Sequence, residues 1–100
     1  MKIKTIDVNA LEWFDRINGN SYFSGEIIVN LGMKGEKRFL MPFQYGYGNA
    51  YEQEACDVLV KEGIITSDNV YITLWRYCAD NKIIMRSYKQ ENCKKSQLKS

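Results

Sequence analysis

Histidine is absent from the 100-residue sequence, and its absence removes several kinds of active site. Histidine is the commonest general base and metal ligand, and it activates the nucleophile in Ser-His and Cys-His pairs. Neither the G-x-G-x-x-G motif nor a Walker-type phosphate loop occurs. We therefore expect no catalytic residues, no metal site and no cofactor, and a protein that is not an enzyme.

Carboxylates come closest to a catalytic or metal-binding pattern at residues 52–57. Glu54 and Asp57 would share one face of a helix, where paired carboxylates can hold a metal or transfer protons. Acidic residues in the first turns of a helix also complement its dipole, and we favour this simpler interpretation.

The chain also lacks a surplus of either charge, since 14 basic and 12 acidic residues give a net charge of +2. This balance is too weak to predict nucleic-acid binding, and it argues against an acidic mimic of DNA. The basic excess lies at the two ends of the chain, and Lys94, Lys95 and Lys99 close it. We expect residues 91–100 to be a frayed polar tail, with a phosphate-binding tail as the alternative.

Apolar runs are short, so none could cross a membrane, and the amino terminus lacks the apolar segment of a signal peptide. We expect a cytosolic protein with no membrane partner, in which the three cysteines are thiols. Their spacings match no zinc or redox motif. Cys56 and Cys78 fall in helix-like segments and are expected in the core, whereas Cys93 is expected to be exposed in the polar tail.

Apolar residues are nevertheless plentiful, at 45% of the chain, and aromatic residues reach 13%. One hundred residues with this composition fold as one domain, so residues 1–100 are expected to be a single domain with a small core. Tyrosine is the commonest aromatic residue, and it suits half-wet contact surfaces.

The first half of the chain has the two-residue period of β-strands. Asn18-Gly19 is a strong hairpin signal, because both residues accept positive φ. Residues 1–9 and 22–31 read as strands on this pattern. Residues 10–17 fit either a strand or a short helix, and we favour the strand because the turn needs a partner on each side.

A further strand is predicted over residues 37–43, with Phe39, Met41 and Phe43 on one face. Pro42 indicates that this strand ends there or lies at a sheet edge. The first half is therefore expected to be an antiparallel β-meander of three to four strands.

The second half changes to helical spacing. A helix is predicted from Asn49, its expected N-cap, to residue 62 before Gly63. Ser67 and Asp68 could cap a second helix over 68–80, and residues 83–90 read as a last strand. The predicted order is β-β-β-α-α-β, an α+β fold.

The stretch between the meander and the first helix is the candidate ligand site. Gly46 and Gly48 let a ligand approach the backbone, the helix N-terminus suits an anion, and Tyr45 and Tyr47 could stack on a base. The alternative is a structural corner in which glycines bend the chain and aromatic rings are buried. The pattern is compatible with both tyrosines facing solvent and with both facing the core.

Isolated arginines in predicted strands could clamp a phosphate beside these aromatic residues. Their alternative role is to pair with Glu12, Glu26 or Glu36 at the surface. The predicted ligand-binding residues are Phe43, Gln44, Tyr45, Gly46, Tyr47, Gly48, Asn49, Arg38 and Arg86.

Aromatic residues also flank the predicted Asn-Gly turn. In a two-sided strand pair, one of Trp13 and Phe14 must face outward, so Trp13, Phe14 and Tyr22 are predicted interface residues. A meander leaves at least one edge strand, and exposed edges pair readily. We therefore expect a homodimer or higher homo-oligomer.

Two segments, WFDRINGNSYF at 13–23 and PFQYGYG at 42–48, resemble a family of small uncharacterised bacteriophage proteins. Tyr77-Cys78 and Asn92-Cys93-Lys94-Lys95 extend the resemblance over most of the chain. The resemblance implies a phage setting in the host cytoplasm, and no residue roles can be carried over from it.

A phage setting favours a non-enzymatic protein that acts on the host, against its defences. Our first hypothesis is that it binds and sequesters a nucleotide-like anionic ligand. The alternative is a protein–protein inhibitor that blocks a host defence factor, in the manner of an anti-CRISPR protein. A structural virion protein is the least favoured, because nothing in the sequence suggests repetition or a fibre.

Overall fold

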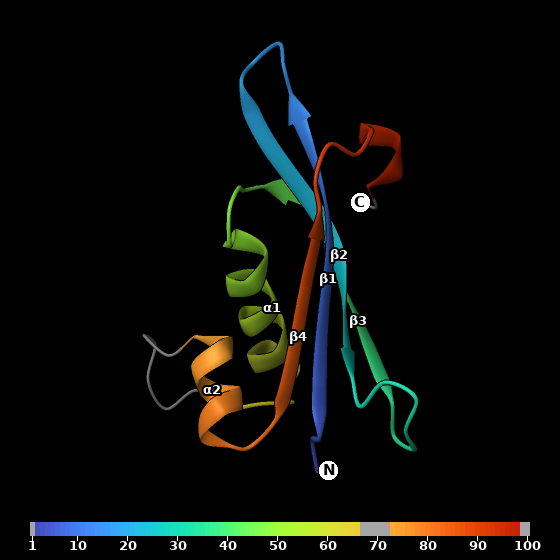
Figure 1. The fold of residues 1–100 in the computed structure, drawn as a ribbon, viewed down its shortest axis with the longest axis vertical. Helices are drawn as coiled ribbons and strands as arrows, with labels where there is room; N and C mark the ends of the chain where they lie inside the picture. The colour runs from blue at the N-terminus through green and yellow to red at the C-terminus, as the bar shows by residue number, and fades with distance from the viewer. Residues whose placement is uncertain (1, 67–72, 99–100) are drawn as a thin grey trace.

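The computed structural model describes residues 2–66 and 73–98. The fold is α+β, and its elements follow the expected order of three strands, two helices and a last strand. Figure 1 shows how they are arranged. The elements are β1 (Thr5–Asp15), β2 (Asn20–Val29), β3 (Lys37–Tyr45), α1 (Ala50–Lys61), α2 (Leu74–Asp80), β4 (Ile84–Gln90) and a 3₁₀ turn (Lys95–Gln97). Residues 10–15 belong to one continuous strand, so the strand interpretation of this segment is confirmed.

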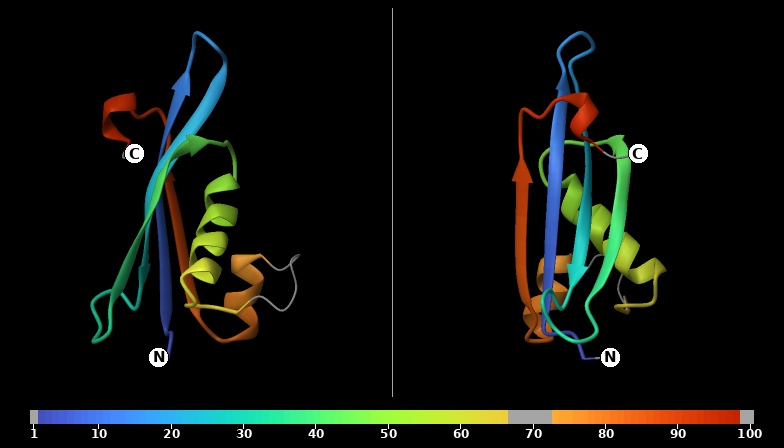
Figure 2. Two further views of the ribbon diagram at one scale, coloured as in Figure 1. Left: turned by 180° about the vertical axis from the view of Figure 1, so that it is seen from behind. Right: turned by 90° about the vertical axis from the view of Figure 1, so that its right-hand side faces the viewer.

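The four strands form one sheet in the order β3-β2-β1-β4. β1, β2 and β3 are antiparallel neighbours, which confirms the predicted meander, and β4 lies parallel to β1. Parallel neighbours need a crossover connection, and α1 and α2 supply it. Figure 2 shows both helices on one face of the sheet, and we call the opposite side the open face.

The core lies between the helices and the covered face of the sheet. The alternation of β1 and β2 places Ile6, Val8 and Ile27 on this face, and all three are fully buried. Leu59 and Leu74 meet them from the helices. Cys56 and Cys78 are buried in the same core, as predicted.

Helix starts match the prediction only in part. α1 begins at Ala50, one residue after the predicted cap, but the Asn49 side chain makes no capping hydrogen bond. α2 begins at Leu74, and the Thr73 side chain caps it by accepting from the Arg76 N–H at 3.1 Å. The expected cap at Ser67 and Asp68 lies outside the described residues.

A β-bulge interrupts the pairing of β2 with β3. Gly25 pairs with Met41, but Phe23 pairs with Gln44, so β3 has one residue more than β2 over this stretch. Pro42 lies in the extra stretch, where its missing N–H costs no ladder hydrogen bond.

This bulge turns Phe43 onto the open face, where its ring stacks on Tyr22. The prediction that Phe43 shares a face with Phe39 and Met41 is therefore wrong. The reason is that strict alternation fails wherever a strand carries an extra residue.

The end of the chain differs from the frayed tail expected from residue 91. The segment after β4 turns back onto β1, where the Cys93 N–H donates to the Glu12 carbonyl at 2.9 Å. Cys93 and Leu98 are buried, so the expectation that Cys93 is exposed is wrong. Asn92 makes the return possible with a φ of 59°, a left-handed conformation that Asn tolerates better than most residues.

Candidate functional site

Four aromatic rings gather on the open face and form what we call the aromatic cluster, namely Trp13, Tyr22, Phe43 and Tyr45. Ring centroids lie 5.5 Å apart between Trp13 and Tyr22 and 5.1 Å apart between Tyr22 and Phe43, both stacked. Tyr45 meets the Tyr22 ring edge-on at 5.8 Å. The cluster joins three strands and includes two of the predicted interface residues, Trp13 and Tyr22.

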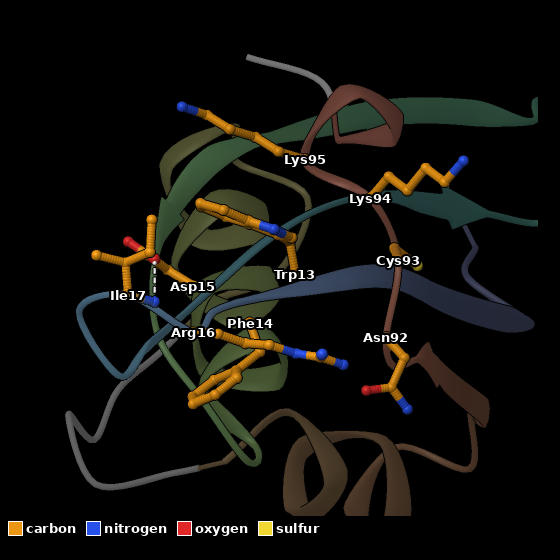
Figure 3. A pocket seen from close by; sticks show the side chains of 9 residues that line it. All are labelled: Trp13, Phe14, Asp15, Arg16, Ile17, Asn92, Cys93, Lys94 and Lys95. Atoms are coloured by element: carbon orange, nitrogen blue, oxygen red, sulfur yellow. Dashed lines mark hydrogen bonds between the residues drawn. The ribbon is translucent and has the colours of Figure 1, made fainter.

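A cleft of about 430 Å³ lies beside this cluster, between residues 13–17 and residues 92–95, and we call it the hairpin cleft. Figure 3 shows its two walls, the end of β1 with the following turn and the returning C-terminal segment. The walls meet because β4 ends at Gln90 while β1 continues to Asp15. The C-terminal segment then packs along the part of β1 that β4 leaves uncovered.

Three cationic residues line the hairpin cleft, namely Arg16, Lys94 and Lys95. In Figure 3 the Arg16 guanidinium extends across the cleft towards Asn92. The Lys95 Nζ lies 5.4 Å from the centroid of the Trp13 ring. No ion pair involves Arg16 within the described part of the chain.

The single carboxylate of the cleft, Asp15, already accepts hydrogen bonds from the turn that follows it. Asp15 Oδ1 accepts from the backbone N–H groups of Ile17 at 3.0 Å and Asn18 at 3.3 Å, and Oδ2 accepts from Asn18 Nδ2 at 2.8 Å. These bonds, with that of the Asn18 side chain first, lower the pKa of Asp15 below its ordinary value. The cleft therefore keeps a net positive charge with an aromatic ring beside it.

Both tyrosines of the predicted ligand turn face solvent, since Tyr45 is 61% exposed and Tyr47 is 70% exposed. The glycines between and after them have structural reasons to be glycine. A Cβ on Gly46 would lie 2.7 Å from the Phe23 ring. Gly48 has open space around it but a φ of +62°, which L-residues rarely adopt.

Charge at this turn is already balanced. The Lys89 Nζ donates to the Gly48 carbonyl at 3.0 Å and pairs with Glu12 at 2.8 Å, and Glu52 lies in the first turn of α1. An anion at this helix N-terminus would meet the Glu52 carboxylate and a lysine that is already neutralised. The turn is accessible, but its electrostatics suit an anion less well than those of the hairpin cleft.

The two predicted arginines lie far from the turn. Arg38 pairs with Glu26 at 2.7 Å and with Glu36 at 3.2 Å, as the alternative interpretation expects. Arg86 pairs with Asp7 at 2.7 Å. The register places both arginines about six residues along the sheet from Tyr45, a separation of roughly 20 Å at the strand rise.

The predicted ligand set therefore does not form one site. Phe43 and Tyr45 belong to the aromatic cluster, whereas Gln44 points to the covered face beside Phe23. Gly46, Tyr47, Gly48 and Asn49 form the turn. The cationic residues that do gather around an aromatic ring come from the hairpin and the C-terminal segment, which the sequence separates by more than seventy residues.

Within residues 2–66 and 73–98, no group of three or more His, Cys, Asp or Glu side chains could hold a metal ion. No helix in these ranges is long and apolar enough to cross a membrane. Comparisons with protein-family models, curated proteins and solved structures find no match to the chain.

Proposed function

We propose that this protein is a non-enzymatic phage protein of the host cytoplasm that counters host defences by sequestering a nucleotide-like anionic ligand in the hairpin cleft. The observation that carries the proposal is the meeting of Trp13 with Arg16, Lys94 and Lys95 in one cleft. An aromatic ring beside clustered cations is what a base and a phosphate require.

Each part of the ligand has a chemical counterpart in the cleft. Arg16 can bind two phosphate oxygens at once, and the lysines add charge without fixed geometry. Lys95 lies over the Trp13 ring, where an exposed cation–π contact is worth about 0.5–1 kcal/mol. Stacking of a base on an aromatic ring contributes about 1–3 kcal/mol. A base can therefore replace the Lys95 ammonium over Trp13, and the freed lysine can pair with the phosphate.

Isothermal titration calorimetry with adenosine and guanosine monophosphates and with cyclic mono- and dinucleotides tests the proposal. We expect at least one of them to bind, and more weakly as salt is raised. Trp13→Ala and Arg16→Gln should each weaken binding about tenfold or more, equivalent to about 1.4 kcal/mol. Arg76→Gln is the matched control, because Arg76 is an exposed arginine on α2.

The outcome of a fourth variant, Tyr47→Ala, distinguishes the cleft from the turn. Tyr47 belongs to the turn and does not line the cleft, so the variant should bind normally. Loss of binding in Tyr47→Ala alone would contradict the proposal that the nucleotide binds in the hairpin cleft. Absence of heat with every nucleotide at millimolar concentration would contradict ligand capture altogether.

A second function, inhibition of a host defence protein, is supported by the tip of the β1–β2 hairpin. Figure 1 shows this hairpin extending beyond the other elements. Ile17 at its tip is 93% exposed, and Phe14 is exposed on its flank. The hydrogen bonds of Asp15 fix the turn in advance, which lowers the entropy cost of inserting it into a partner's pocket.

Pull-down from host lysate tests this second function. The wild-type protein should retain one stoichiometric partner, and Ile17→Ser or Phe14→Ala should lose it. Trp75→Ala serves as the control, because Trp75 is an exposed aromatic residue on α2, away from the hairpin. A partner that is retained equally by all three variants would count against the hairpin as the binding element.

A further inference from the structure

The sheet has two edge strands, and they differ in how well they are protected against pairing with another strand. β3 carries Pro42 and the β-bulge, both of which interrupt regular pairing along an edge. β4 has neither, and its register with β1 is continuous from Ile84 to Gln90. Figure 2 shows no element beyond β4 on its outer side in the view that faces the sheet.

Side chains on β4 are also unusual for a free edge. Ile84 and Tyr88 are each 62% exposed, on the open face. The two cations of the strand are neutralised within the chain, Arg86 by Asp7 and Lys89 by Glu12. Natural edge strands commonly present unpaired charges that repel a neighbour. This strand instead presents apolar side chains and balanced charge.

We infer that β4 pairs with β4 of a second copy of this chain, antiparallel and across a twofold axis, to form a continuous eight-stranded sheet. Closed twofold dimers are the commonest oligomers. A twofold axis at this edge pairs β4 with the same strand of the second copy. The proposal does not depend on the function of the hairpin cleft.

The backbone determines which groups are available for this pairing. The Ile84 N–H donates to the Lys4 carbonyl, so it points towards β1. Successive residues of a strand point to alternate sides, so the N–H and C=O groups of Met85, Ser87 and Lys89 point to the free edge. Ser87 is the middle residue of β4, and centring the twofold axis on it pairs the whole strand.

The resulting register is complementary in size and charge. Ser87 lies opposite its own copy, where two small side chains permit close approach. Arg86 lies opposite the partner's Tyr88, a favourable cation and aromatic pair. Met85 lies opposite the partner's Lys89, so no two like charges face each other directly. The self-complementary register is the reason for assigning a second copy, in preference to an unrelated peptide, to this edge.

Sedimentation velocity over a range of concentrations tests the dimer, and two substitutions at one exposed position test its register. Tyr88→Lys places a lysine opposite the partner's Arg86 on both sides of the axis, and should weaken dimerisation at least tenfold. Tyr88→Glu places a carboxylate there instead, and should dimerise about as well as the wild type. Equal effects of the two substitutions would overturn the proposed register.

A cross-linking experiment identifies the edge directly. Ser87→Cys should form a disulfide-linked dimer under mild oxidation, because paired strands bring the two Cα atoms within disulfide range. The three native cysteines are buried and give little background. Leu40→Cys on β3 is the control and should stay monomeric on denaturing gels. A wild-type monomer at high micromolar concentration, or cross-linking through Leu40→Cys alone, would overturn the inference.

Discussion

At the scale of single residues, the two glycines before α1 meet different requirements. Gly46 is buried, and its N–H donates to the Ser21 carbonyl at 3.0 Å, which fastens the turn to β2. The Phe23 ring occupies the space that a side chain on Gly46 would need. Gly48 instead supplies a left-handed backbone conformation in open space. Position 46 therefore requires glycine because there is no room for a Cβ, and position 48 favours glycine because its φ is positive.

Gly46→Ala should destabilise the protein by about 1–3 kcal/mol, the usual cost of overpacking a core. The added Cβ would lie 2.7 Å from the Phe23 ring and 3.0 Å from the Ala50 Cβ. Gly48→Ala is the matched comparison and should cost about 1 kcal/mol for the left-handed conformation. Urea unfolding measures both. Equal stability of Gly46→Ala and the wild type would show that Phe23 can move aside.

Asp15 stabilises the hairpin tip through its charged form. Its lowered pKa means that this contribution is present above the unfolded value and is lost as pH falls through the folded pKa. Asp15→Ala should therefore lower the free energy of unfolding near neutral pH, and the difference from wild type should shrink below about pH 4. Urea unfolding across this pH range measures the difference. A difference that stays constant with pH would contradict the role of the charge.

At the scale of elements, one buried ion pair connects three parts of the chain. Lys89 on β4 pairs with Glu12 on β1 and donates to the Gly48 carbonyl before α1. Both charged side chains are nearly buried, at 14% and 13% exposure. Burial lowers the pKa of Lys89, but the hydrogen bond and charge of Glu12 outweigh it, so the pKa is raised. The pair thus positions the turn against the sheet.

Lys89→Met should cost on the order of 3 kcal/mol, because it leaves the Glu12 carboxylate buried without a partner. Adding Glu12→Gln should recover part of the loss. Arg76→Met is the control, since its exposed pair with Asp80 should contribute less than about 1 kcal/mol. Thermal unfolding compares the three proteins with the wild type.

The same pair has a pH dependence with a definite sign. A lysine whose folded pKa is raised contributes stability below its unfolded pKa and loses it as pH rises through the folded value. The cost of Lys89→Met should therefore be constant at neutral pH and decline in the alkaline range. A cost that stays constant throughout the alkaline range would contradict the role of the charged Lys89 side chain.

At the scale of the whole molecule, one face of the sheet is covered and the other is open. All three thiols are buried. Cys56 and Cys78 lie between helices and sheet, and Cys93 lies within the C-terminal segment, where its N–H bonds to β1. Burial raises the pKa of Cys56, and it raises the pKa of Cys78 to about 11. The rate at which each thiol is alkylated therefore measures how often the surrounding part of the protein unfolds locally.

Alkylation at pH 8 should modify Cys93 first, because the C-terminal segment can detach locally. Cys78 should react only on global unfolding, since a pKa of about 11 leaves roughly one thiolate in a thousand at this pH. Peptide mass spectrometry over time measures each site, with a urea-unfolded sample as the control. Equal rates at Cys78 and Cys93 would contradict the placement of the two thiols.

The sequence by itself determined the kind and order of the elements. Period-two alternation, the Asn18-Gly19 turn and the change to helical spacing after Asn49 all act over a few residues, so they are readable along the chain. The interpretation of residues 10–17 as strand succeeded for the same local reason up to Asp15, where β1 ends and the turn begins. These features predict an α+β fold, but not which strands become neighbours.

Only the tertiary structure decided where the candidate site lies. The bulge that turns Phe43 outward and the bond from Cys93 to Glu12 both depend on contacts between distant parts of the chain. Lys94 and Lys95 read as a solvated tail in the sequence because nothing local relates them to Arg16. Long-range pairing brings them to one cleft, and a local pattern carries no information about such pairing.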